Sequence, residues 1–241
     1  MNIALVLAGG SGSRVGVSCP KQYLRVKDKL VISYCLETLH KAKEVDTIWI
    51  VADEKWRSTI LGAVDTDKIR GFSVPGKTRQ LSVCHGLGDI QAYIMGRDRR
   101  SKDNIKSGKK HTVLIHDAAR PLLTLEMIGR CYEGLAGHEG VMPVLPMKDT
   151  VYFSNDGHSV SSLLNRSQLY AGQAPELFDF EKYYAVCRGL TREQLLQING
   201  STEPAVLAGM DIVMIPGDEN NFKITTMEDL ERFRQLMNRD Y

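Results

Sequence analysis

The sequence has no long apolar run, no paired cysteine motif and no marked excess of charge. No stretch of its 241 residues approaches the roughly 18 apolar residues that a membrane-spanning helix needs. The five cysteines lie far apart without a Cys-x-x-Cys pair, which favours free thiols in a reducing compartment over disulfides or zinc. A net charge of +2 gives no general attraction to nucleic acid or anionic membranes. We therefore expect a cytoplasmic protein without nucleic-acid or membrane partners.

The N-terminus also lacks the features of a signal peptide. MNIALVLAGG has no basic region and no cleavage site, so we expect Ile3–Leu7 to form a first strand. Internal repeats and low-complexity segments are absent too. With 43% apolar and 25% charged residues, the composition is that of an ordinary globular protein, and the length suits one substantial core. Residues 1–241 are expected to form a single domain.

Short apolar runs alternate with amphipathic segments along most of the chain. Apolar residues recur at helical spacing in Ile32–Leu39 and again in Val83–Ile94. This alternation predicts an α/β fold with a doubly wound, mostly parallel sheet, in which ligands bind at the carboxyl ends of the strands. The predicted strands are Ile3–Leu7, Thr47–Ala52, Gly71–Val74, His111–Ile115, Gly140–Leu145 and Asp211–Ile215. Further helices are predicted at Lys55–Val64, Leu125–Leu135 and Met227–Met237, and Phe178–Gln197 is expected to be mostly helical.

The pattern changes between residues 146 and 174. Asn155-Asp156-Gly157 separates two short strand-like runs, which is a strong hairpin signal. A hairpin that leaves an α/β body either packs as an extra edge or protrudes as an arm, and protruding arms commonly mediate dimer contacts. We expect residues 146–174 to form such an arm and the protein to be a homodimer.

One stretch, residues 97–110, is strongly basic. It carries seven cations against two aspartates. A nucleic-acid or partner contact is one interpretation, but no aromatic side chains stand between the charges as stacking platforms would. A solvated loop is the favoured interpretation.

The stretch Leu7–Leu24 combines close glycines with cations. Backbone N–H groups of a glycine-rich loop can cradle phosphate, and two cations can hold a polyphosphate from two sides. A dinucleotide-binding fingerprint is not met because Val15 occupies the third glycine position, and no Gly-Lys-Ser/Thr closes the turn as in a P-loop. A structural tight turn is the alternative. The residues concerned are Gly9, Gly10, Gly12, Arg14 and Lys21.

Five motifs, in their order and spacing, resemble one known family. It comprises the cytidylyltransferases that transfer CMP to sugar-alcohol phosphates, namely the methylerythritol-phosphate enzymes and their ribitol-5-phosphate relatives. The resemblance runs nearly end to end, and it implies a Rossmann-like nucleotidyltransferase fold. The motifs are LAGGSGSRVGVSCPKQYL, GKTRQLSV (Gly76–Val83), HDAARP (His116–Pro121), RSQLYAGQAPELF (Arg166–Phe178) and NFKITTMEDL (Asn221–Leu230).

The resemblance implies a reaction in which a polyol phosphate attacks the α-phosphorus of CTP and displaces pyrophosphate, with Mg²⁺ on the triphosphate. Catalysis of this kind depends mainly on positioning and charge neutralisation. By the resemblance, Arg14 and Lys21 stabilise the transition state, and Lys223 lies near the α-phosphate and the acceptor. His116 is expected to be a hydrogen-bonded residue at a strand end, not a general base, because a phosphate nucleophile is already ionised at pH 7.

The same resemblance assigns the nucleotide contacts. Ala8, Gly9 and Gly10 match the backbone segment that holds cytosine and ribose, while Gly12 completes the glycine cradle. Gly76 and Ser82 match the second nucleotide loop. Asp117 and Ala118 match the junction between nucleotide and acceptor, where Asp117 would orient the ribose or the waters of Mg²⁺, or else cap a loop. These assignments come from the resemblance and cover Ala8, Gly9, Gly10, Gly12, Gly76, Ser82, Asp117 and Ala118.

The acceptor side is assigned in the same way. Arg120 matches a position near the acceptor phosphate, with a buried structural arginine as the alternative. Thr150 and Arg166 lie on and beside the expected arm. In the family, the corresponding arginine reaches into the partner subunit's site and holds the acceptor phosphate, which a guanidinium can bind bidentately.

Two departures from the family pattern fall on this acceptor side. Ala174 stands where most relatives have threonine, and Thr202-Glu203-Pro204-Ala205 is the nearest remnant of a Thr-Asp-Asp-Ala segment. The motifs favour D-ribitol 5-phosphate as acceptor, giving CDP-ribitol, with 2-C-methyl-D-erythritol 4-phosphate as the alternative. A catalytically silent homologue that only binds nucleotide is a third interpretation.

Overall fold

The computed structural model describes residues 1–10, 19–98 and 110–239. Gly12 and Arg14 lie outside these residues, and so does most of the basic stretch 97–110. Within the described part of the chain, no helix is long and apolar enough to cross a membrane.

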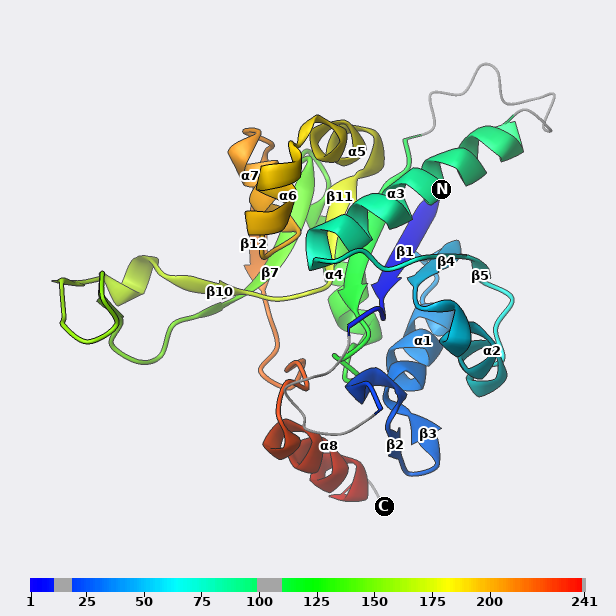
Figure 1. The fold of residues 1–241 in the computed structure, drawn as a ribbon, viewed down its shortest axis with the longest axis horizontal. Helices are drawn as coiled ribbons and strands as arrows, with labels where there is room; N and C mark the ends of the chain where they lie inside the picture. Colours follow the sequence, from blue (N-terminus) through cyan, green and yellow to red (C-terminus); the bar gives the residue numbers. More distant parts are fainter. Residues whose placement is uncertain (11–18, 99–109, 240–241) are drawn as a thin grey trace.

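A central sheet of eight strands organises the fold (Figure 1). β6, β1, β4 and β5 run parallel side by side, and β12 runs parallel to β7. β11 lies antiparallel between β6 and β7, and β10 is antiparallel to β7. In chain order the strands are β1 (Asn2–Leu7), β4 (Thr47–Val51), β5 (Ile69–Ser73), β6 (Thr112–Asp117), β7 (Gly140–Pro146), β10 (Tyr170–Gly172), β11 (Glu176–Asp179) and β12 (Ile212–Pro216).

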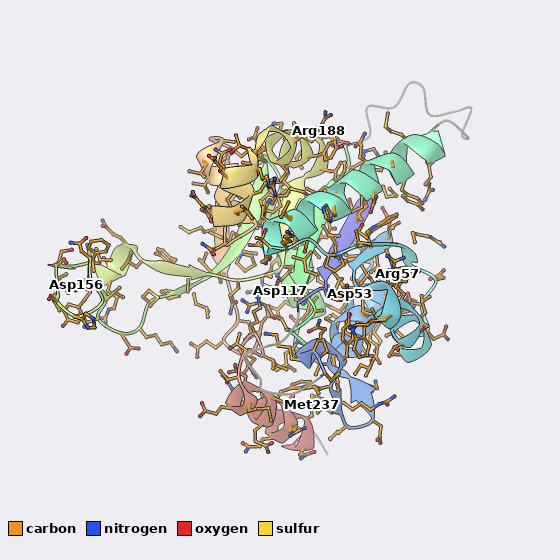
Figure 2. The ribbon with its side chains drawn as sticks, in the orientation of Figure 1. Asp53, Arg57, Asp117, Asp156, Arg188 and Met237 are labelled. Atoms are coloured by element: carbon orange, nitrogen blue, oxygen red, sulfur yellow. The ribbon has the colours of Figure 1, made fainter. Side chains whose placement is uncertain are left out.

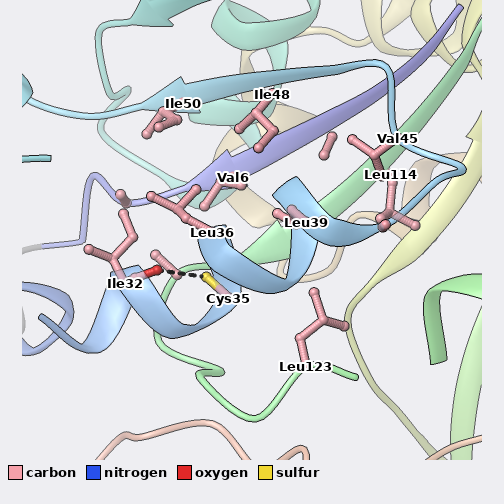
Figure 3. Packing of buried hydrophobic residues seen from close by; sticks show 14 of the residues in the cluster. Val6, Ile32, Cys35, Leu36, Leu39, Val45, Ile48, Ile50, Leu114 and Leu123 are labelled. Carbon is pink, nitrogen blue, oxygen red and sulfur yellow. Dashed lines mark hydrogen bonds between the residues drawn. The ribbon is translucent and has the colours of Figure 1, made fainter. Parts of the chain in front are cut away.

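Helices cover both faces of the sheet, as the alternating pattern predicts. One core cluster joins α1, α2 and α4 to the strands, and Figure 3 shows Leu36 and Leu39 of α1 lying against Val6 and Ile48. A second cluster joins α3 and α5 to the opposite side chains of the same strands. The predicted apolar faces of α1 and α3 are buried, which confirms their spacing as core positions. The helices are α1 (Val31–Lys41), α2 (Glu54–Ala63), α3 (Arg79–Asp98), α4 (Leu125–Gly134), α5 (Phe180–Gly189), α6 (Arg192–Gln197), α7 (Thr202–Leu207) and α8 (Met227–Arg239).

Residues Phe178–Gln197 are mostly helical, as expected, but they form two helices and not one. Phe178 belongs to β11, and the helix begins only at Phe180, because the side chain of Asp179 caps it by accepting from the N–H of Lys182. A second helix, α6, begins after a break in the helical structure, because Thr191 and Gln194 form a capping box at its start. The short helix α7 and strands β10 and β11 are not predicted from the sequence.

Residues between β7 and β10 extend away from the sheet (Figure 1). They contain an antiparallel pair, β8 (Tyr152–Phe153) with β9 (Ser162–Leu163), and a 3₁₀ turn, η3 (Arg166–Gln168). The loop between the two strands is wider than the tight turn expected at Asn155-Asp156-Gly157. Its shape comes from Asp156, whose Oδ1 accepts from the backbone N–H groups of His158 and Ser159.

Candidate functional site

A cleft of about 580 Å³ lies at the carboxyl ends of the parallel strands. The register pairs Leu7 of β1 with Asp117 of β6 and with Val51 of β4, and Val51 pairs with Ser73 of β5. The strands therefore end in one row, and the loops that follow β1, β5 and β6 meet there, as expected for a parallel sheet. Gly9, Gly10, Gly76, Ser82, Asp117, Lys21 and Lys223 all line this cleft.

The loop after β1 is held by the 3₁₀ turn η2 (Lys21–Tyr23). Gln22 Nε2 donates to the carbonyl oxygens of Ala8, at 2.6 Å, and Gly10, at 2.9 Å, and the hydroxyl of Tyr23 also donates to the Ala8 carbonyl. These bonds bring the chain back to the end of β1. Lys21 consequently faces the same cleft as Gly9 and Gly10.

The two glycine loops also approach each other closely. A Cβ atom on Gly9 would lie 2.3 Å from the Cβ of Pro75, so only glycine permits this contact without a shift. A Cβ on Gly76 would lie 2.4 Å from that of Leu81. The Ser82 hydroxyl supports this second loop, because it accepts from the N–H of Gly76 and donates to the carbonyl of Thr78, both at 3.0 Å.

Asp117 is the centre of the charges in the cleft, and Figure 2 labels it in the middle of the molecule. Its Oδ1 lies 3.2 Å from Nε of Arg79. Its Oδ2 lies 2.8 Å from Nζ of Lys223 and 3.8 Å from Nε of Arg120. Burial alone would raise the pKa of Asp117, but Arg79, Lys223 and Arg120 hold it well below its usual range. The carboxylate is therefore ionised at any physiological pH.

The cleft as a whole is positively charged. Among the described residues that line it, the cations are Lys21, Lys77, Arg79 and Lys223, whereas Asp117 is the one acidic side chain. A concave site with such an excess of positive charge focuses the electrostatic field inside it and therefore attracts polyanions. Its chemistry suits a triphosphate next to a second phosphate.

Some predicted residues support the cleft without lining it. Ala118 is fully buried, and its N–H donates to the Leu7 carbonyl at 3.0 Å. Arg120 is mostly buried, and its Nη1 donates to the Asn221 carbonyl at 2.7 Å, which gives it a structural contact beside its place near Asp117.

His116 is a hydrogen-bonded strand-end residue, as expected from the sequence. The histidine is fully buried, with Nε2 lying 3.0 Å from the Arg120 carbonyl. Burial lowers its pKa to about 4, so it is neutral at pH 7.

Thr150 and Arg166 are not brought to the cleft of their own chain. Both are exposed, and Arg166 donates to the carbonyl of Lys148 within the extended segment. The far end of that segment, marked by Asp156 in Figure 2, lies on the opposite side of the picture from the helices around Asp53. Neither Thr150 nor Arg166 is among the described residues that line the cleft.

Two members of the charge cluster, Arg79 and Glu176, are not singled out by the sequence patterns. Arg79 lies inside the GKTRQLSV motif, and Glu176 follows Ala174-Pro175. Arg79 Nη2 lies 3.4 Å from Glu176 Oε2 although 97 residues separate them. An arginine at the first position of a helix, where the helix dipole disfavours positive charge, is the one local signal that could have identified it.

A model of the family described as 2-C-methyl-D-erythritol 4-phosphate cytidylyltransferase matches residues 2–239. A protein of that name from Rubrobacter xylanophilus is 32% identical over 229 residues, covering 95% of this chain and 91% of that protein. A ribitol-5-phosphate cytidylyltransferase from Vibrio parahaemolyticus is 30% identical over 242 residues, covering 98% of this chain and 96% of that protein.

Solved structures share the fold. A 4-diphosphocytidyl-2C-methyl-D-erythritol synthase from Anaerococcus prevotii matches with a TM-score of 0.76 and 24% identity, over 98% of this chain and 96% of that one. Another crystal structure of a 4-diphosphocytidyl-2C-methyl-D-erythritol synthase matches with a TM-score of 0.77 and 23% identity, over 98% of each chain. The mostly parallel sheet with helices on both faces is thus the architecture of these proteins.

Proposed function

This chain belongs to the 2-C-methyl-D-erythritol 4-phosphate cytidylyltransferase family, and we propose that it transfers CMP from CTP to D-ribitol 5-phosphate, with release of pyrophosphate. The chain is a nucleotidyltransferase by its family. The acceptor is the part that we infer. The observation that carries the proposal is the cleft at the ends of β1, β5 and β6, whose described lining includes four cations and one carboxylate.

In the proposed complex, the nucleotide lies across the two glycine loops. Gly9, Gly10 and Gly76 leave the backbone open to the nucleotide, and Gly12 would extend the same loop. Lys21 enters the cleft from η2 and would neutralise charge on the triphosphate, together with Arg14. Such neutralisation lowers the barrier because negative charge is redistributed over the phosphoryl oxygens in the transition state.

The acceptor phosphate would approach from the side of Lys223 and Arg120. Both cations contact Asp117, so the carboxylate keeps them in place before the substrate arrives. The acceptor needs no general base, since its phosphate is ionised at pH 7. His116 is neutral and fully buried and would take no part in the transfer.

Mg²⁺ would accompany the triphosphate. Among the described residues, no group of three or more His, Cys, Asp or Glu side chains could hold a metal ion. Mg²⁺ commonly binds one or two carboxylates plus substrate phosphates, and the single carboxylate of the cleft, Asp117, fits that donor set. The ion would neutralise phosphate charge, while Asp117 would orient its waters.

We further propose that the enzyme is a homodimer in the cytoplasm. Thr150 and Arg166 do not line the cleft of their own chain, and the segment 146–174 that carries them extends from the body, so they would reach the partner's acceptor site. All five cysteines are free, which suits a reducing compartment.

The preference for D-ribitol 5-phosphate rests on sequence details that resemble the ribitol-phosphate branch of the family. They are Leu7-Ala8-Gly9-Gly10 and Tyr170-Ala171-Gly172-Gln173. A relative of similar identity uses ribitol 5-phosphate, according to its name. The family model and the Rubrobacter relative favour 2-C-methyl-D-erythritol 4-phosphate, which is the second candidate.

A panel of polyol phosphates tests the proposal. Pyrophosphate release from CTP and Mg²⁺ would be measured with D-ribitol 5-phosphate, 2-C-methyl-D-erythritol 4-phosphate, erythritol 4-phosphate and glycerol 3-phosphate. The expected result is the highest kcat/KM with D-ribitol 5-phosphate. A higher kcat/KM with the methylerythritol compound would move the acceptor to the second candidate, and CTP binding without turnover on any acceptor would overturn the enzymatic role.

A further inference from the structure

Arg79 joins three segments that are distant in the sequence. Its Nε donates to Asp117 Oδ1 at the end of β6, its Nη1 to the Ser201 hydroxyl just before α7, and its Nη2 to Glu176 Oε2 at the start of β11. A guanidinium presents its donors in one rigid plane, so three acceptors in these directions allow it a single orientation.

The position of Arg79 is costly unless these acceptors are present. It is the first residue of α3, where the helix dipole repels a cation, and its side chain is only 23% exposed. Burial alone would lower the pKa of Arg79, but Asp117 and Glu176 raise it above its usual value. The two carboxylates therefore stabilise a charged guanidinium inside the protein.

The contact with Arg79 determines which oxygen of Asp117 is left for other partners. Arg79 occupies Oδ1, and Oδ2 then faces Lys223 at 2.8 Å. The Lys223 side chain is 33% exposed and lines the cleft. A rotation of the Asp117 carboxylate would move Oδ2, to which the Lys223 ammonium binds. The ammonium would move with it, and its position in the cleft would change.

We propose that Arg79 is a positioning residue: held by Glu176 and Ser201, it fixes the Asp117 carboxylate so that Asp117 holds Lys223 in place for phosphoryl transfer. The proposal deepens the proposed function and rests on it. Arg79 acts through Asp117 and Lys223 rather than by contact with the reacting atoms.

Glu176 has an anchoring part in this arrangement. It is almost fully buried, with Oε2 accepting from Arg79 and Oε1 accepting from the Thr202 hydroxyl, each at 3.4 Å. A glutamine would still offer one oxygen to the guanidinium, whereas a leucine would leave Nη2 without its acceptor. The two substitutions therefore separate the hydrogen bond from the charge.

Arg79→Lys tests the positioning role directly. An ammonium keeps the charge but cannot reach three acceptors in one plane, so we expect kcat to fall on the order of 100-fold, the cost of misplacing a reacting group by about 1 Å. The KM for CTP should change less than about threefold. Arg192→Lys is the matched control: Arg192 is also the first residue of a helix, α6, but its side chain is exposed, and its kcat should stay at the wild-type value.

Two substitutions of Glu176 and one double variant complete the test. Glu176→Gln should retain kcat within a few-fold, while Glu176→Leu should lose as much as Arg79→Lys. Because Arg79 acts through Lys223, Arg79→Lys combined with Lys223→Ala should be no slower than Lys223→Ala alone. Losses that multiply, or a loss confined to the KM for CTP, would overturn the proposal by making Arg79 a direct contact of the nucleotide.

Unfolding in urea separates this proposal from the proposed function. If the wild-type protein turns over no acceptor, the proposed function fails, but the coupling of Arg79 and Lys223 is still measurable. We expect the urea midpoint of the double variant Arg79→Lys/Lys223→Ala to fall by clearly less than the sum of the falls measured for the two single variants. Shifts that add would refute the link through Asp117.

Discussion

Lys21 illustrates how a single side chain acquires its role from its neighbours. Gln22 and Tyr23 tie η2 to the carbonyl of Ala8, and this contact places Lys21 over the end of β1. The ammonium lines the cleft that would hold the polyphosphate, so its removal should affect catalysis more than folding.

Lys21→Ala is therefore expected to lower kcat on the order of 100- to 1,000-fold, the usual loss when one charge-stabilising group is removed. Thermal unfolding should remain within a few degrees of the wild type. Lys41→Ala, at the exposed end of α1, serves as the control with the same substitution. Near-normal pyrophosphate release by Lys21→Ala would refute its assignment.

His116 controls how stability responds to mild acid. In the unfolded chain its pKa is near 6.5, but in the folded protein burial lowers it to about 4. As pH falls from 6.5 towards 4, the unfolded state binds a proton that the folded state does not, and folding loses about 3 kcal/mol in this window. The Asp117 carboxylate contributes little until the pH approaches 4, because only there does the unfolded chain begin to protonate this side chain while the folded protein keeps it ionised.

The variant His116→Gln should flatten this dependence. Glutamine cannot titrate, yet its amide can donate to the Arg120 carbonyl, which His116 contacts at 3.0 Å. Urea unfolding at pH 7 and at pH 4.5 would measure the difference. The wild type should lose more stability than the variant by roughly 2 to 3 kcal/mol, and equal losses would show that His116 takes up its proton at its ordinary pKa.

At the scale of elements, the sequence predicts most of what local periodicity controls. The buried faces of α1 and α3 follow from apolar residues at helical spacing, and β1, β4 and β6 follow from short apolar runs. β11 escapes prediction because its four residues lead directly into α5, so that a single apolar stretch serves both elements. Only pairing with β6 and β7 makes it a strand.

The candidate site also contains some residues that local sequence patterns predict and others that only the tertiary fold brings together. Its glycines and lysines lie in motifs that the chain displays locally, whereas the contacts of Arg79 with Asp117 and Glu176 span 38 and 97 residues. Such contacts exist only after the sheet has formed. They depend on the strand order, which periodicity alone does not determine.

The approach of the two glycine loops provides an element-scale prediction. In Gly9→Ala the new Cβ would meet Pro75 at 2.3 Å, so the loops after β1 and β5 must separate. We expect a loss of about 1 to 3 kcal/mol of stability, as for other overpacked sites, and much weaker CTP binding. Isothermal titration with CTP and urea unfolding would measure both effects.

Gly62→Ala is the matched control for that variant. Gly62 lies in α2, and a Cβ there would have no heavy atom within 4 Å. Since alanine is favoured over glycine in helices, this change should stabilise the protein by up to about 1 kcal/mol and leave CTP binding unchanged. Unaltered CTP affinity in Gly9→Ala would contradict the role of the loop contact.

At the scale of the whole molecule, the question is whether one chain makes a complete site. Lys21 lines the cleft, but Arg166 does not, and it belongs to the segment that extends away from the sheet. If residues 146–174 serve the partner's site, each site of a dimer combines Lys21 of one chain with Arg166 of the other. The symmetry of such a dimer makes the two contributions separable.

Mixing two inactive variants tests this arrangement quantitatively. In a dimer of Lys21→Ala with Arg166→Ala, one site carries both substitutions and the other carries neither. Equal amounts of the two chains, unfolded and refolded together, would give about half mixed dimers, so about a quarter of all sites should be intact. Pyrophosphate release should recover to about a quarter of the wild-type rate, although each variant alone is nearly inactive. A mixture no more active than the average of its components would mean that every chain uses its own Arg166 or none, and the shared site would have to be abandoned.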